Sequence, residues 1–196
     1  IAVVLQHMGR PAEALPHVWR AFELYDDEDQ RLRALNDVGI MFLMLGDPIA
    51  AEQALLQVVR KGGSQGNVSN AQIELMHCAS YRRDRVAFAR WRRQCEERKG
   101  DMPPNILADY HLKAGVGEAR FGLLRRSRAS LARALKVAED AKLHQFVFHI
   151  ELVVKGLHDC GEALAATLYT DVEPVIQNEA VREVSASLAQ LVTEPI

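Results

Sequence analysis

The chain has 196 residues and a mass of 21.9 kDa, enough for one domain, or at most two, with a sizeable core. Apolar residues make up 48% and charged residues 26%, which excludes a wholly disordered chain. The formal net charge of −2 gives no general case for nucleic acid or a membrane as partner, and no apolar run reaches the ~18–20 residues of a spanning helix. Alanine and leucine provide a quarter of the residues and aromatics only 6%, which predicts an all-α fold.

Three cysteines, Cys78, Cys95 and Cys160, are widely spaced and form no Cys-x-x-Cys pair. This odd, scattered set predicts neither a disulfide framework nor a zinc ribbon, and it favours the reducing cytoplasm. The sequence opens at Ile1 inside an apolar helical pattern, so we expect it to be part of a longer protein.

A turn signal recurs along the chain. Gly9-Arg10-Pro11 and Gly46-Asp47-Pro48 begin 37 residues apart, and in each the glycine ends one helix while the proline starts the next. A further 37 residues along, Arg83-Asp84 keeps a polar turn without the glycine, and Phe121-Gly122 marks a fourth turn. The sequence therefore predicts repeated helix–turn–helix units over residues 1–26, 30–62, 67–99, 104–142 and 143–169, with a terminal helix over 171–193.

Small residues are expected where the two helices of a unit cross. In the second unit Gly39 on the first helix and Ala51 on the second are the small residues expected at the crossing, and the larger Leu55 and Val58 lie on the same side of the second helix. In the fourth unit Gly115 repeats the role of Gly39, and Leu131 repeats that of Leu55. Apolar residues at Phe146, Ile150, Val153 and Leu157 predict the first helix of a fifth unit.

These residues resemble the tetratricopeptide repeat family. The best match is Leu35…Val38-Gly39…Phe42…Gly46-Asp47…Ala51…Leu55…Val58, followed by Gly9…Ala14…Val18…Ala21. The spacing of ~37–40 residues exceeds the usual 34, and Leu35 stands where the family places tryptophan. Longer, degenerate repeats of this kind resemble those of bacterial regulatory proteins. The resemblance implies a right-handed α-solenoid of antiparallel helix pairs that binds a protein or peptide.

In such a solenoid the first helices line a groove, and their residues turned away from the second helices are the candidate contacts. Asparagine pairs with an extended backbone, methionine and isoleucine give adaptable apolar contact, and arginine holds a carboxylate. The candidate groove residues are Arg33, Asn36, Ile40, Met44, Asn70, His77, Tyr81, Asp109 and Arg120, with Val3, Gln6, His7, Leu43, Ile73, Leu112 and Val116 beside them.

The sequence offers no pattern for catalysis or for a cofactor. Gly-x-Ser-x-Gly, phosphate-loop, GxGxxG and HExxH motifs are missing. His77 and Cys78 are adjacent, so on a helix they point about 100° apart and form no dyad. His144, His149 and His158 have no acidic partner at a ligand-like interval, so we predict no metal site and no enzyme.

Charge is concentrated in the middle of the chain, where residues 60–142 carry 18 basic and 9 acidic side chains. Two interpretations stay open: a solvated outer helix face, or a site for an acidic partner. Nucleic acid is the weaker alternative.

The terminal helix has an apolar face over Val172, Val175, Ile176, Val181, Val184, Leu188 and Leu191. Two roles fit this face: it caps the repeats, or it associates with a second copy. Taken together, the patterns predict a non-enzymatic sensing or docking module that binds a protein segment, with self-association, or a place in a transcription regulator, as the alternative.

Overall fold

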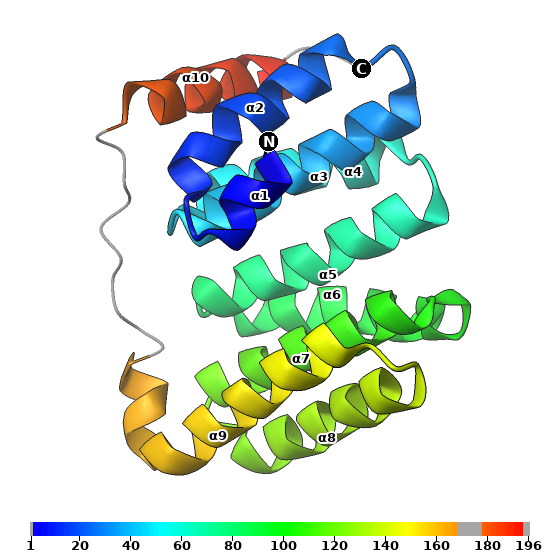
Figure 1. Ribbon diagram of the computed structural model, residues 1–196, viewed down its shortest axis with the longest axis vertical. Helices are drawn as coiled ribbons and strands as arrows, with labels where there is room; N and C mark the ends of the chain where they lie inside the picture. The colour runs from blue at the N-terminus through cyan, green and yellow to red at the C-terminus, as the bar shows by residue number, and fades with distance from the viewer. Residues whose placement is uncertain (1, 168–177, 194–196) are drawn as a thin grey trace. The chain divides into compact units, whose positions relative to one another are not determined.

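Every regular element is a helix in the part of the chain that the computed structural model describes, which is residues 2–167 and 178–193, without the side chains of residues 3, 7 and 158–167. The prediction of an all-α fold is therefore confirmed. The helices are α1 (Ala2–His7), α2 (Pro11–Leu24), α3 (Glu28–Met44), α4 (Pro48–Lys61), α5 (Gln65–Tyr81), α6 (Arg85–Arg98), η1 (Lys99–Asp101), α7 (Pro104–Arg120), α8 (Leu124–Asp140), α9 (His144–Thr167) and α10 (Glu179–Thr193) (Figure 1).

The chain divides into two compact units. Unit 1 contains residues 1–74 and 171–196, and unit 2 contains residues 75–170. Helix α5 therefore contributes its first part to unit 1 and its last part to unit 2. The arrangement of the whole chain as one continuous repeat domain stays a prediction.

In unit 1 the helices pack in sequential order, α1 on α2, α2 on α3 and α3 on α4. The crossing of α3 and α4 is close because Gly39 has no side chain: a Cβ atom built there would lie 2.7 Å from Cγ of Leu55. Both Leu35 and Leu55 are fully buried in this core. The close approach predicted at Gly39 is thus seen, but the residue nearest to Gly39 on α4 is Leu55 rather than the predicted Ala51.

Unit 2 repeats this crossing between α7 and α8. A Cβ atom on Gly115 would lie 2.7 Å from Cγ of Leu131, so the fourth helix–turn–helix repeat has the same glycine–leucine contact as the second repeat. Helix α9 packs on both α8 and α7 (Figure 1). One apolar cluster in the core of this unit is formed by Ala108, Leu112, Leu131, Ala134, Ala138 and Ile150.

The turns between paired helices share one conformation. Gly9, Gly46, Arg83 and Gly122 have positive φ angles of 68°, 79°, 55° and 74°. At Gly46 the turn is closed by a hydrogen bond of 2.9 Å from the N–H of Asp47 to the carbonyl of Phe42, and the N–H of Asp84 donates to Ala79 at the same distance. This is the Schellman end of a helix, which glycine normally provides. The recurrent turn signal therefore corresponds to a recurrent backbone geometry.

Two of these turns also start the next helix in the same way. The carboxylate of Asp47 accepts hydrogen bonds from the N–H groups of Ile49 and Ala50 at 3.1 and 2.9 Å. The carboxylate of Asp84 accepts from Val86 and Ala87 at 3.0 and 2.9 Å. Each aspartate satisfies N–H groups that have no partner within the helix.

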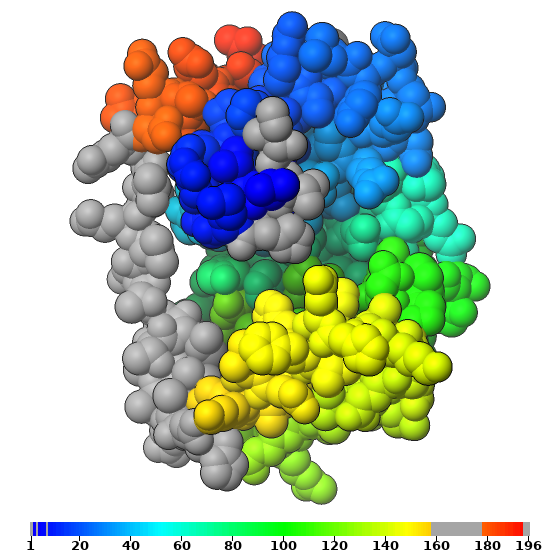
Figure 2. Space-filling view, viewed as in Figure 1, coloured from blue at the N-terminus to red at the C-terminus, as the bar shows by residue number. Residues whose placement is uncertain are grey.

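The terminal helix α10 packs on α2 and α4. Figure 2 shows it directly beside α2. Its apolar side chains Val181, Val184 and Leu188 are buried. The face that we expect either to cap the repeats or to bind a second copy is therefore used within unit 1. Outside the described residues lie Asp171, Val172, Val175 and Ile176, on which the predicted start of this helix depends.

Candidate functional site

The candidate groove residues lie in both units. In unit 1, Arg33 and Met44 are exposed, Ile40 and Asn70 are half-buried, and Asn36 is only 3% exposed. Burial leaves the Asn36 amide little surface for a ligand. The side chains of Val3 and His7 lie outside the described residues. Unit 2 holds the other four candidates, namely His77, Tyr81, Asp109 and Arg120.

A pocket of about 460 Å³ lies in unit 2 among the end of α5, one face of α7 and one face of α9. We call it the α7–α9 pocket. Three of the four candidates of this unit line it. Its lining residues are His77, Asp109, Leu112, Lys113, Val116, Ala119, Arg120, Phe146, His149, Val153, Gly156 and Leu157.

Arg120 is the most constrained polar residue of the pocket. Its Nη1 donates a hydrogen bond of 2.7 Å to Oγ of Ser80, and the guanidinium lies over the Tyr81 ring, with 3.7 Å between Cζ and the ring centroid. The side chain is 5% exposed. A stacked and hydrogen-bonded guanidinium has few rotamers left, so its charge is fixed at this end of the pocket.

His77 stands beside this guanidinium in the neutral form. Removal of the ring from water lowers its pKa well below the ordinary value, and the charges of Arg120 and Lys113 lower it further. Nδ1 of His77 lies 3.4 Å from Nη1 of Arg120, where a neutral ring nitrogen accepts a hydrogen bond. The ring also meets the edge of Tyr81, with centroids 5.0 Å apart.

The middle of the pocket combines an ion pair with apolar walls. Nζ of Lys113 lies 2.7 Å from Oδ2 of Asp109, one helical turn away on α7, and both side chains are about one-fifth exposed. The apolar wall on α7 is formed by Leu112 and Val116, and the wall on α9 by Phe146, Val153 and Leu157. An apolar pocket with a few fixed polar groups is the usual form of a ligand site.

The pocket also contains residues that are missing from the candidate set. Phe146, Val153 and Leu157 belong to the apolar pattern that predicts α9, but that pattern does not separate core positions from pocket positions. Ile150, in the same series, is fully buried in the core, whereas the other three are half-buried. His149 is exposed and lies at the pocket wall.

In unit 1 one further polar residue lies near the candidate residues of α3. Burial raises the pKa of Asp37 to about 6, while the nearby charge of Arg33 acts in the opposite direction. Asp37 is not predictable as a perturbed group from the sequence, because residue spacing alone does not show that a carboxyl group is removed from water.

The described side chains contain no cluster of three or more His, Cys, Asp or Glu residues arranged to hold a metal ion. Cys78 and Cys95 are free and buried, and burial raises the pKa of Cys95 to about 12. Of His144, His149 and His158, only His158 has a side chain outside the described residues. None of the described helices combines the length and the apolar character that crossing a membrane requires.

The family model for the tetratricopeptide repeat matches residues 1–60. This match confirms the resemblance for the part of the chain that forms α1 to α4. No curated protein and no solved structure matches the chain. Tetratricopeptide repeats generally mediate protein–protein interaction and are typically non-enzymatic scaffolds. The α7–α9 pocket lies beyond the matched residues, and of its helices α7 makes the same glycine–leucine crossing, with α8, that α3 makes with α4.

Proposed function

We propose that this protein is a non-enzymatic scaffold that binds a protein segment in the α7–α9 pocket. The match of residues 1–60 to the tetratricopeptide repeat supports a role in protein binding. The observation that carries the proposal is the pocket itself. It lies on the first helices of successive helix pairs, where the repeat architecture places a ligand. A docking role within a larger regulatory protein is supported by the resemblance to regulatory repeat proteins.

The lining favours a segment with an apolar side chain. Val116 on α7 and Val153 on α9 are half-buried, so each has surface left to contact a ligand. Covering this surface supplies affinity through the hydrophobic effect. The fixed charge of Arg120 favours a carboxylate at the same end of the segment, either from an acidic side chain or from a chain terminus.

A scaffold role is also supported by the chemistry of the lining, since its described residues include no hydroxyl or thiol side chain. The neutral His77 has a guanidinium as its neighbour and lies in a cluster with Ser80 and Tyr81 whose hydrogen bonds and ring contacts position Arg120. These contacts serve to hold a cation in place.

The test is a selection of peptides from a random display library on the purified chain, followed by affinity measurements with two matched variants. Val153→Gln changes a residue that lines the pocket, and Val154→Gln changes its neighbour, which is 41% exposed and does not line it. We expect Val153→Gln to weaken binding about five- to tenfold, the effect of losing one buried aliphatic contact. Val154→Gln should leave the affinity unchanged.

Equal affinities of the two variants would contradict the placement of the ligand in the α7–α9 pocket. If the selection yields no peptide that binds the wild-type chain, the result would contradict segment binding itself. The two substitutions lie next to each other on α9, so they form a matched pair. Circular dichroism of both variants checks that each keeps its helical fold.

A further inference from the structure

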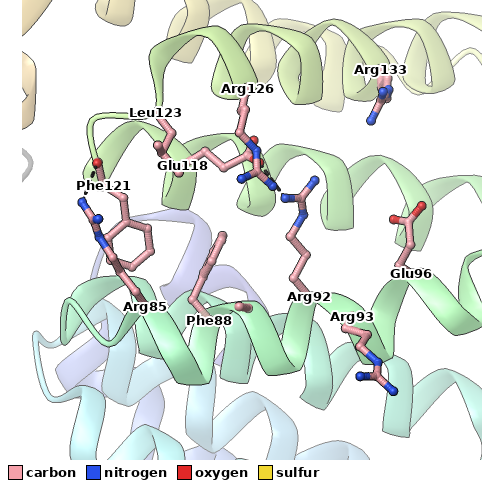
Figure 3. A pocket seen from close by; sticks show the side chains of 11 residues that line it. Arg85, Phe88, Arg92, Arg93, Glu96, Glu118, Phe121, Leu123, Arg126 and Arg133 are labelled. Atoms are coloured by element: carbon pink, nitrogen blue, oxygen red, sulfur yellow. Dashed lines mark hydrogen bonds and ion pairs between the residues drawn. The ribbon is translucent and has the colours of Figure 1, made fainter.

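A second pocket, of about 490 Å³, lies on other faces of unit 2, among α6, the end of α7 and α8 (Figure 3). We call it the arginine pocket. Five arginines and two glutamates line it, together with apolar residues at one end. The lining residues are Arg85, Phe88, Ala89, Arg92, Arg93, Glu96, Glu118, Phe121, Leu123, Arg126 and Arg133.

A buried carboxylate organises the centre of this pocket. The side chain of Glu118 is completely buried, and its Oε1 lies 2.8 Å from Nη1 of Arg92 and 3.4 Å from Nε of Arg126. Its Oε2 accepts a hydrogen bond of 2.7 Å from Oγ of Ser130. In Figure 3 the two arginines reach this carboxylate from opposite sides, one from α6 and one from α8.

One carboxylate does not use all the donors of two guanidinium groups. Each guanidinium has five N–H donors in a planar fork, and Glu118 engages one edge of each. The side chain of Arg126 remains 61% exposed and that of Arg92 24% exposed. The buried Glu118 therefore fixes two cations, of which Arg126 in particular keeps exposed donors for an acidic ligand, while Arg92 also hydrogen-bonds to Tyr110.

The other glutamate of the lining is already engaged at the edge of the pocket. Glu96 forms an ion pair with Lys99 and accepts a hydrogen bond of 2.7 Å from the hydroxyl of Tyr110. Arg133 reaches from α8 towards α6 in Figure 3, whereas Arg93 points away from the pocket and pairs with Glu97 at 3.0 Å. Besides Arg85 at its apolar end, the cations of the pocket are thus Arg92, Arg126 and Arg133.

The end of the pocket nearest the α7–α8 turn is apolar. The rings of Phe88 and Phe121 meet edge to face with centroids 5.1 Å apart, and Leu123 is 37% exposed beside them. Arg85 lies over the Phe121 ring and donates a hydrogen bond of 3.1 Å to the Phe121 carbonyl. An apolar contact surface therefore adjoins the cations.

We propose that the arginine pocket is a second binding site and that it takes an acidic segment of a partner protein. Carboxylates of the segment pair with Arg92, Arg126 and Arg133, and a neighbouring apolar side chain packs on Phe121 and Leu123. The site is independent of the α7–α9 pocket, since α7 contributes Glu118 here and a different set of residues there.

Acidic peptide fits this pocket better than nucleic acid. The planar guanidinium groups match a carboxylate in a bidentate manner, and the buried ring of Phe88 offers no face for base stacking. Carboxylates placed at intervals along a peptide can pair with the separate arginines of the pocket.

The test uses a short fluorescein-labelled peptide in which glutamates flank a phenylalanine, the same peptide with glutamine in place of glutamate, and a single-stranded DNA of equal length. Fluorescence anisotropy is measured with the full chain, with Arg126→Gln/Arg133→Gln, and with the control Arg125→Gln/Arg128→Gln. The control residues are exposed on the same helix, do not line the pocket and remove the same charge.

We expect the acidic peptide to bind the wild-type chain and the pocket variant to bind it about tenfold or more weakly, as the loss of charge-assisted hydrogen bonds predicts. The control variant should stay within about twofold of wild type. Equal weakening in both variants, equal binding of the glutamine peptide, tighter binding of the DNA, or no binding of the acidic peptide would each overturn the proposal. Neither pair of substitutions touches the α7–α9 pocket, so this outcome is separate from that of the proposed function.

Discussion

Arg83 takes, in the third helix–turn–helix repeat, the turn position that Gly46 takes in the second repeat, and both have a left-handed backbone, with φ angles of 55° and 79°. The flanking hydrogen bonds are also the same, since the N–H groups of Arg83 and Gly46 donate to Ser80 and Leu43 at 3.2 and 3.1 Å. The turn therefore keeps its geometry after losing its glycine, although this conformation is unfavourable for a residue with a Cβ atom.

This strain predicts the effect of restoring the glycine. We expect Arg83→Gly to have a free energy of unfolding about 1 kcal/mol higher than that of Arg83→Ala, because only glycine adopts this backbone without a steric cost. The comparison with alanine removes the contribution of the arginine side chain from both variants. Urea denaturation measures the difference, and a more stable alanine variant would show that the turn is not strained.

The glycine–leucine crossing gives a second prediction. Gly115→Ala should lower the free energy of unfolding by about 1–3 kcal/mol, because the added methyl group meets Leu131 and also lies 3.2 Å from the backbone oxygen of Ser127. Gly66→Ala is the matched control, since a Cβ atom at that helical glycine has nothing within 4 Å. The control should be neutral or should stabilise the protein by about 0.5–1 kcal/mol. Equal effects of the two substitutions would show that the α7–α8 crossing is not close.

The two glycine crossings illustrate what the sequence predicts well. Gly39 and Gly115 face Leu55 and Leu131 because the 3.6-residue period assigns each residue to a side of its helix, and the turn signals fix which two helices are paired. These local rules predict the helices and their pairing.

Contacts beyond the pair follow from rules that the sequence does not contain. The helical period places Asn36 and Arg120 on a groove side, yet both are buried, because burial depends on which neighbouring helix covers them. The apolar face of α10 is plain in the sequence, but any apolar surface of the chain satisfies it, and so the contact with α2 and α4 is not predictable. The burial of Asp37 and the α9 wall of the α7–α9 pocket are unpredictable for the same reason, because both depend on which helices pack together.

The buried carboxylate of the arginine pocket provides a third prediction. Glu118→Gln should lower the free energy of unfolding by about 2–4 kcal/mol, because it leaves Arg92 and Arg126 close together without the charge that pairs them. The control is Glu97→Gln, whose ion pair with Arg93 is exposed and contributes about 0–1 kcal/mol. Thermal and urea unfolding measure the stability of both variants. A Glu118→Gln protein as stable as wild type would show that the ion pairs of the buried Glu118 do not stabilise the fold.

Asp37 gives a prediction for the dependence of stability on pH. Its pKa in the folded protein is about 6, above the ordinary value of 3.8, so the folded state favours the neutral carboxyl group. The contribution of Asp37 to stability therefore falls as the pH rises from about 4 to about 6, because the group ionises more readily in the unfolded chain.

Asp37→Asn removes this contribution and should raise the free energy of unfolding at neutral pH by about 1–3 kcal/mol, with the difference shrinking towards about pH 4. Urea denaturation at several pH values measures the effect. Asp26→Asn, at an exposed aspartate, controls for the loss of one negative charge. A variant that is less stable than wild type at neutral pH would show that the carboxylate of Asp37 stabilises the fold.

The central claim is that a protein segment binds in the α7–α9 pocket. Amide NMR of the isotope-labelled chain, titrated with a peptide selected by display, tests it most directly because each backbone N–H reports separately. We predict saturable shift changes along residues 109–120 of α7 and 146–157 of α9, which carry the walls of the pocket. Changes confined to α6 and α8 would move the ligand to the arginine pocket, and the absence of saturable changes in α7 and α9 would contradict the claim.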